Sequence, residues 1–364
     1  MIPVTKPTLP TLEQYVSYLQ RIWQTRWLTN NGDFSLLLEK RLREYLGIKN
    51  MVLVANGTLA LNLALKSLNL QGEVITTPFT FVATTNSIVW EGLTPIFADI
   101  DAETFNISPE DVEKKITEKT CAILAVHVYG NPCDVKSLAT IASDHGLKLL
   151  YDGAHSFGVE YGNRSIFDYG DVSTLSFHAT KVYNTIEGGA LVTCEAKLAE
   201  ELRLLRDHGI ISAEEFIGLG INAKMNEFQA AMGLCNLELV DQDIEMRKTL
   251  YKLYISELSS GKLRFQRLVC SKYNYAYMPV CFEDERQRNR VCSELSRRGF
   301  GSRKYFYPLT VSARHFMANQ NLIYRFGLQV ASDVARRILC LPLYPGLKLD
   351  DVYQIVNIIR EIVA

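Results

Sequence analysis

From the N-terminus to about residue 194, short continuous apolar runs alternate with stretches whose apolar residues recur three and four positions apart. The first pattern is typical of strands buried on both faces, and the second of helices. Predicted strands are 51–55, 74–77, 96–99, 122–128, 148–152, 172–176 and 189–194. Predicted helices are 12–23, 34–45, 59–68, 82–91, 109–116 and 135–145. Helical crossovers between strands predict an α/β fold with a seven-stranded, mostly parallel sheet covered on both faces.

The pattern changes after residue 209, where a glycine-containing loop at 218–222 precedes a predicted long helix beginning near Met225. Beyond about residue 240, predicted helices and strands no longer alternate regularly. Helices are predicted at 284–298, 330–338 and 349–362, and short strands at 275–281 and 339–341. We therefore predict two domains. Residues 1–238 form a large domain with an N-terminal arm, and residues 239–364 form a smaller C-terminal α+β domain.

Composition narrows the class of protein. The 364 residues are 48% hydrophobic and 22% charged, which is typical of a packed globular chain. A net charge of -1 and the lack of a long basic run argue against nucleic-acid binding. No apolar stretch reaches the roughly 18–20 residues of a membrane span, and no secretory signal is recognisable, so we expect a cytoplasmic protein. The eight cysteines and six histidines follow no metal-ligand spacing, so no metal is expected.

Lys181 is the first candidate for chemistry, because it lies between two predicted strands and shortly before Gly188 and Gly189. Burial lowers the pKa of an amine, and a neutral amine can attack a carbonyl to form a Schiff base. Asp152 ends another predicted strand. A strand-end aspartate and a loop lysine are what pyridoxal phosphate needs, as partners for its ring nitrogen and its aldehyde. A structural lysine is the alternative.

Three further features would complete such a site. Gly57 and Thr58 open a predicted helix, whose free N–H groups and dipole favour a phosphate; simple helix capping is the alternative. Phe81 follows a strand end and could stack on a flat ring, or could be a core residue. Ser176 could bind phosphate, or be a satisfied strand-end hydroxyl. Since parallel strands meet at one edge of the sheet, the combination favours a pyridoxal phosphate site.

Several stretches resemble the DegT/DnrJ/EryC1/StrS sugar aminotransferases. They are residues 56–58, 80–84, 151–158, 176–181, 187–190, 220–231 and 341–345. The resemblance covers nearly the whole chain. It implies a pyridoxal phosphate-dependent transferase of fold type I, which is aspartate aminotransferase-like, and a homodimer whose active sites lie at the subunit boundary.

The resemblance also implies roles for individual residues. Lys181 is the catalytic Schiff-base lysine, and Asp152 is the partner of the pyridinium nitrogen. The other implied cofactor contacts are Gly57, Thr58, Phe81, His155, Ser176 and Asn222. The implied substrate contacts are Thr29, Asn30, Asn31, His178, Lys224, Tyr305 and Tyr307.

One motif departs from the family pattern. The Gly-x-Asn-x-Arg-Met motif, which the neighbouring subunit supplies, reads Gly220-x-Asn222-x-Lys224-Met225 here. Lysine thus replaces the usual arginine, which puts the role of Lys224 in more doubt than that of Asn222. Some relatives carry histidine in place of the Schiff-base lysine and act as dehydratases, but Lys181 is present in this chain.

Residues 178–189 and 303–308 are most similar to the branch that acts at C4 of nucleotide-linked 4-keto-6-deoxy sugars. The resemblance therefore implies an amino group moved from L-glutamate, which leaves as 2-oxoglutarate, to a nucleotide sugar. The expected acceptor is dTDP-4-keto-6-deoxy-D-glucose, on a route to O-antigen or another surface glycan. A C3-keto sugar, a UDP- or GDP-linked sugar, and a catalytically silent cofactor-binding regulator stay open as alternatives.

Overall fold

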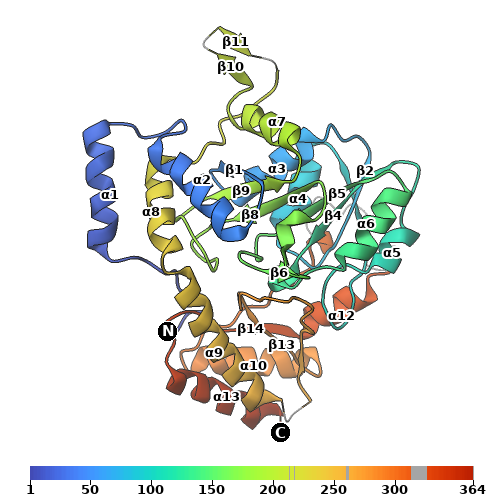
Figure 1. Ribbon diagram of the computed structural model, residues 1–364. Helices are drawn as coiled ribbons and strands as arrows, with labels where there is room; N and C mark the ends of the chain where they lie inside the picture. Colours follow the sequence, from blue (N-terminus) through green and yellow to red (C-terminus); the bar gives the residue numbers. More distant parts are fainter. Residues whose placement is uncertain (213, 217, 260–261, 313–325, 364) are drawn as a thin grey trace.

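The computed structural model describes residues 1–212, 214–216, 218–259, 262–312 and 326–363. Its centre is a seven-stranded sheet in the order β1-β9-β8-β5-β4-β2-β3 (Figure 1). The strands are β1 Asn50–Val54, β2 Glu73–Thr76, β3 Thr94–Phe97, β4 Thr120–Val126, β5 Lys148–Asp152, β8 Val172–Ser176 and β9 Gly189–Thr193. Only β9 runs against its neighbours, β1 and β8. The predicted mostly parallel sheet is therefore confirmed.

Helices cover both faces of this sheet, which is why its strands are continuously apolar. Alternate residues of β1 show the division: Val52 and Val54 join one buried cluster, while Met51 and Leu53 join the other. The first cluster includes side chains of α3 Gly57–Ser67 and α7 Ala196–Arg206. The second includes side chains of α2 Asp33–Leu46, α5 Pro109–Lys114 and α6 Val135–Asp144. The remaining helices of this part are α1 Leu12–Thr25, α4 Val82–Trp90 and α8 Glu227–Leu237.

A second part of the chain lies below the large sheet in Figure 1. It has a three-stranded antiparallel sheet of β12 Arg264–Phe265, β13 Met278–Cys281 and β14 Ile338–Leu341. Its helices are α9 Val240–Leu258, α10 Glu285–Arg297, α12 Gln329–Arg337 and α13 Leu349–Val363. The start of the chain also packs here, since Ile2 pairs with Phe300. The domain boundary after residue 238 stays a prediction.

Some elements differ from the prediction. The predicted strand 275–281 is shorter, because Tyr275 has a φ of 52° and a strand needs negative φ. The predicted long helix is interrupted between α8 and α9. The sequence pattern did not predict helices α7 and α9. It also did not predict two hairpins, which are β6 Glu160–Tyr161 with β7 Arg164–Ser165 and β10 Ile210–Ser212 with β11 Glu215–Phe216.

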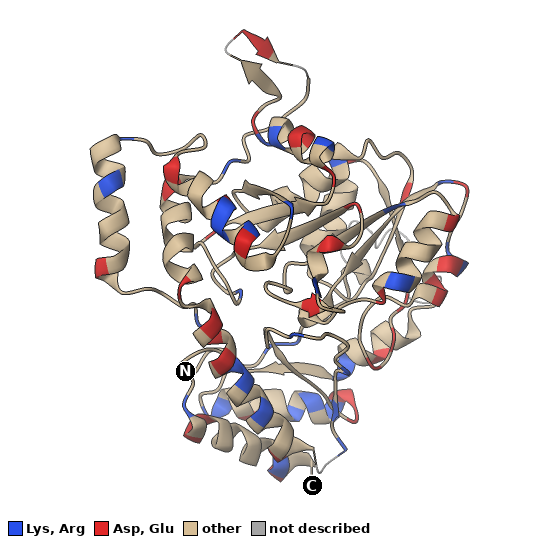
Figure 2. Cartoon of the chain, in the orientation of Figure 1, with Lys and Arg blue, Asp and Glu red and all other residues tan. Residues whose placement is uncertain are grey.

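Basic and acidic residues are interspersed along the outer helices in Figure 2. Within the described ranges, no helix combines the length and the apolar character that crossing a bilayer requires.

Glu227 on α8 anchors the start of α2. Its carboxylate is buried and accepts hydrogen bonds from the backbone N–H groups of Phe34 at 2.8 Å and Ser35 at 2.9 Å. The residue before α2, Gly32, has no side chain to cap the helix. A carboxylate at a helix N-terminus satisfies free N–H groups and complements the helix dipole.

We expect Glu227→Ala to lower the free energy of unfolding by about 2 kcal/mol, because two buried N–H groups lose a charged acceptor. Glu227→Gln keeps one oxygen acceptor and should lose less. Urea denaturation of the two variants beside the wild type measures both changes. Equal stability of Glu227→Ala and the wild type would show that the cap contributes nothing.

Candidate active site

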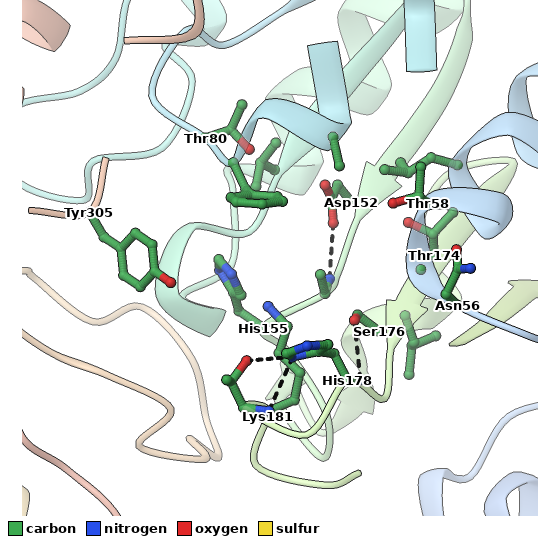
Figure 3. Close-up of a pocket in the computed structure, with 18 of the residues that line it drawn as sticks. Asn56, Thr58, Thr80, Asp152, His155, Thr174, Ser176, His178, Lys181 and Tyr305 are labelled. Atoms are coloured by element: carbon green, nitrogen blue, oxygen red, sulfur yellow. Dashed lines mark hydrogen bonds between the residues drawn. The ribbon is translucent and has the colours of Figure 1, made fainter. Parts of the chain in front are cut away.

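A cavity of about 650 Å³ opens at the carboxyl ends of the central strands, where α3 and α4 begin. This is the edge at which parallel α/β sheets bind ligands. Figure 3 shows its lining from several elements, with Lys181 and Asp152 extending toward the same space. Nine of the predicted site residues line it: Gly57, Thr58, Phe81, Asp152, His155, Ser176, His178, Lys181 and Tyr305.

Asp152 is the last residue of β5 and is only 6% exposed. One carboxylate oxygen accepts a hydrogen bond from the backbone N–H of Ala154 at 3.0 Å. The other accepts from the Thr84 hydroxyl at 2.7 Å. These two donors hold the carboxylate at the cavity wall, and a buried carboxylate needs such donors to stay charged.

Lys181 lies in the loop after β8, where its backbone N–H donates to the carbonyl of His178 at 2.9 Å. Burial lowers the pKa of its amine from 10.5 to about 8. The charge of Asp152 acts the other way and raises this pKa, while the charge of Arg303 lowers it further. The neutral, nucleophilic fraction of this amine near neutral pH is therefore much larger than that of an ordinary lysine.

The N-terminus of α3 forms a cradle for an anion. Among the described residues, no acceptor meets the backbone N–H groups of Gly57 and Thr58, whereas the side chain of Asn56 caps Leu59 at 2.9 Å. Gly57 packs so closely on Ser176 that an added Cβ would lie 2.9 Å from the Ser176 Cβ. The free N–H groups, the helix dipole and the hydroxyls of Thr58 and Ser176 together suit a phosphate.

His155 forms part of the cavity wall as a neutral imidazole. Burial lowers its pKa well below 6.5, and the charge of Lys181 adds to this effect. Its Nδ1 accepts a hydrogen bond from the backbone N–H of Tyr129 at 3.2 Å, which leaves the proton on Nε2. The ring lies nearly parallel to Phe306, with centroids 5.9 Å apart, and meets Tyr277 edge-on at 4.9 Å.

Two aromatic residues face the same cavity. Phe81, at the start of α4, is 52% exposed, unusually so for a phenylalanine that lines a cavity. Tyr305 lies below the guanidinium of Arg303, whose central carbon is 4.4 Å from the ring centroid. His178, at the cavity rim, has its Nε2 3.5 Å from the carboxylate of Glu187.

The remaining predicted residues of the site, which are the cofactor contact Asn222 and five substrate contacts, lie outside this cavity in the single chain. Tyr307 instead lines an adjoining groove of about 380 Å³. The side chain of Asn31 accepts a hydrogen bond from Arg206 at 2.8 Å. Lys224 forms an ion pair with Asp207. The others outside the cavity lining are Thr29, Asn30 and Asn222. Their predicted roles stay predictions.

Sequence reasoning missed several residues of the lining. They are Asn56, Thr80, Thr174, Glu187, Tyr277, Arg303 and Phe306. Thr84, which donates to Asp152, was missed as well. One signal was available for Thr80, Thr84 and Arg303, because they lie in the stretches 80–84 and 303–308 that carry the family resemblance. Tyr277 lies in none of the stretches that carry this resemblance.

A sequence profile described as the DegT/DnrJ/EryC1/StrS aminotransferase family matches residues 11–360. The chain belongs to this family. It is 40% identical over 367 residues to a dTDP-4-amino-4,6-dideoxy-D-glucose transaminase of Shigella dysenteriae, covering 99% of this chain and 98% of that protein. It is 32% identical to a GDP-perosamine synthase of Vibrio cholerae, covering 99% of both chains.

A solved structure has the same fold as this chain. It is the crystal structure of DesI in the presence of its TDP-sugar product. The TM-score is 0.92 at 31% identity, with 99% of this chain and 92% of that chain covered. This likeness confirms the predicted fold class.

Proposed function

We propose that this protein is a pyridoxal phosphate-dependent aminotransferase that moves the amino group of L-glutamate to C4 of dTDP-4-keto-6-deoxy-D-glucose. The observation that carries the proposal is that Lys181 and Asp152 face one cavity whose wall includes the open N-terminus of α3. The family and the 40% identical dTDP-sugar transaminase support the reaction type and the acceptor. The less similar GDP-perosamine synthases leave the GDP-linked alternative in place.

The cavity residues fit the chemical groups of pyridoxal phosphate. Gly57, Thr58 and Ser176 suit the phosphate, since this cradle has N–H and hydroxyl donors. Phe81 and His155 offer flat faces for the ring. Asp152 suits the ring nitrogen and Lys181 the aldehyde. When bound, the cofactor withdraws electrons from the α-carbon of an attached amine, which makes its proton acidic.

The side chains supply the proton transfers and the charges. The Lys181 amine would hold the aldehyde of the cofactor and, when free, would serve as the base and then the acid that moves the proton of the donor α-carbon. The Asp152 carboxylate would be the acceptor for the ring nitrogen. Arg303, a cation in the cavity wall, is placed to hold a carboxylate of the donor. In the overall reaction the amino group of L-glutamate would be exchanged for the ketone oxygen of the sugar, with 2-oxoglutarate as the co-product. The water consumed when 2-oxoglutarate forms would be balanced by the water released when the sugar ketone is aminated.

The pKa of Lys181 makes a pH prediction. The rate at which the apo-protein captures pyridoxal phosphate should rise with pH through a midpoint near 8, because only the neutral amine attacks the aldehyde. Arg303→Gln should move the midpoint up, since the Arg303 charge lowers the pKa of this amine. Stopped-flow absorbance from pH 6 to 10 measures both. The control Arg267→Gln removes an exposed ion pair with Glu103 and should leave the midpoint unchanged. A wild-type rate that still rises at pH 10 without having passed a midpoint, as for a lysine with the ordinary pKa of 10.5, would contradict the assignment.

Product analysis tests the function directly. The purified protein, with pyridoxal phosphate and L-glutamate, is incubated with a panel of dTDP-, UDP- and GDP-linked keto sugars, and NMR identifies the aminated carbon. We expect amination at C4 of the dTDP-linked 4-keto-6-deoxy sugar. Amination at C3, or preference for UDP or GDP, would replace the substrate assignment. A protein that gains no visible band with pyridoxal phosphate and releases no 2-oxoglutarate would support the silent regulator.

A homodimer with shared active sites is part of the proposal. Asn222 and Lys224 lie outside the cavity of their own chain, as expected of residues that serve a neighbour. Hybrid dimers, purified from co-expressed and differently tagged Lys181→Ala and Asn222→Ala chains, provide the test. Because one of the two sites in the hybrid would hold both intact residues, it should be more active than either parent. A hybrid no better than its parents would show that each chain serves itself.

A further inference from the structure

Thr84 makes a contact that the proposed chemistry has not used. It lies in the first turn of α4, is fully buried, and donates its hydroxyl hydrogen to Asp152 at 2.7 Å. A threonine inside a helix commonly bonds a backbone carbonyl one turn back. Here the hydroxyl instead crosses from α4 to the end of β5.

The hydroxyl of Thr80 continues this contact. It lies 2.8 Å from the hydroxyl of Thr84 and is also buried. A hydroxyl has one hydrogen to donate. Because Thr84 gives its hydrogen to the carboxylate of Asp152, Thr80 must be the donor to Thr84. The order of donation is therefore Thr80 to Thr84 to Asp152, and aligned hydrogen bonds of this kind polarise and strengthen one another.

This direction depends on the charge of Asp152. An ionised carboxylate only accepts hydrogen bonds, whereas a protonated one carries a hydrogen of its own. A chain of hydroxyls that ends by donating to Asp152 therefore uses this carboxylate as an acceptor. The second carboxylate oxygen is held by the Ala154 N–H, so both oxygens have a fixed donor.

We propose that Thr84, supported by Thr80, is a positioning residue that holds the Asp152 carboxylate oriented toward the ring nitrogen of the cofactor. The proposal rests on the proposed pyridoxal phosphate function. It makes the strength of the ring as an electron acceptor depend on a hydroxyl that does not touch the cofactor. Thr84 acts through Asp152 alone.

The neighbouring residue offers a matched control. Thr85 is also fully buried on α4, and its hydroxyl also donates to another threonine hydroxyl, that of Thr310, at 2.9 Å. Thr85 is not part of the cavity lining. Valine at position 84 or 85 has the same shape as threonine. At position 84 it removes two buried hydrogen bonds, the one to Asp152 and the one from Thr80, and at position 85 it removes one. Only the change at position 84 removes a donor to Asp152.

The experiment compares Thr84→Val, Thr84→Ser and Thr85→Val with the wild type. We expect Thr84→Val to lower kcat with L-glutamate about tenfold while KM changes less than about twofold, the size expected for one hydrogen bond to a charged group. Its dissociation constant for pyridoxal phosphate, from fluorescence titration of the apo-protein, should rise several-fold. Thr84→Ser keeps the hydroxyl and should recover both values to within about twofold of the wild type. Thr85→Val should match the wild type in both.

Two results would overturn the inference while leaving the proposed function intact. The first is that the wild type is active and that Thr84→Val has the same kcat and the same cofactor affinity as the wild type. The other is an equal loss in Thr84→Val and Thr85→Val, which would show a packing effect. A wild-type protein that binds no pyridoxal phosphate would overturn the proposed function and, with it, this inference.

Discussion

Replacing Lys181 by alanine should lower the rate of transamination by about 10³-fold or more, because the side chain is the proposed acid and base at the reacting carbon. Pyridoxal phosphate should still bind, since the cradle of Gly57, Thr58 and Ser176 and the carboxylate of Asp152 are untouched. Steady-state release of 2-oxoglutarate measures the rate. Fluorescence titration of the apo-protein measures the cofactor affinity.

A lysine elsewhere controls for the loss of a partly buried amine. Lys115 at the end of α5 is 14% exposed in its side chain and pairs with Asp111. It is not part of the cavity lining, so Lys115→Ala should keep wild-type turnover. Full turnover in Lys181→Ala, with cofactor bound, would refute the assignment of the catalytic lysine.

Replacing Asp152 by asparagine should lower kcat by about 10²- to 10³-fold, because it removes a preorganised charge from the site while preserving the shape of the side chain. Asparagine cannot hold the proton of the ring nitrogen by charge, so the ring becomes a weaker electron acceptor. The change also removes the charge that raises the pKa of Lys181, so the midpoint for cofactor capture should move to lower pH.

Asp171→Asn is the matched control for Asp152→Asn. Asp171 also accepts a hydrogen bond from a backbone N–H, that of Leu149, and it forms an ion pair with Lys148. It lies directly before β8, at the edge of the sheet opposite to Asp152. Its replacement should leave kcat and the capture midpoint unchanged. Wild-type kcat in Asp152→Asn would exclude the proposed role of this carboxylate.

Local sequence was enough to predict most of the large sheet. Strand β5 has the predicted ends, because a short apolar run bounded by polar residues marks a strand buried on both faces. Strand β8 has the predicted ends as well, although Ser173 and Thr174 interrupt its apolar residues. Prediction was poorer where tertiary contacts decide the conformation. The left-handed backbone of Tyr275 shortens β13, although a tyrosine side chain favours strands. Strand β10 was missed for a different reason, because it is short and exposed and has no buried face to impose a pattern.

The candidate site divides in the same way. Lys181, Asp152 and the start of α3 were predicted from sequence because each lies at a strand end or helix start, and the topology of a parallel sheet gathers such ends at one edge. Arg303 could not be placed by this rule. It reaches the cavity from the second part of the chain, where its backbone pairs with Cys340 of β14.

The sequence by itself determined the α/β class, the family and the lysine–aspartate pair, because these depend on periodicity and on short motifs. Only the tertiary structure decided how the pair is tuned. Burial beside Asp152 and Arg303 sets the pKa of Lys181, and the hydroxyl of Thr84 holds the Asp152 carboxylate. Both effects depend on distances between side chains from separate elements, which no local pattern specifies.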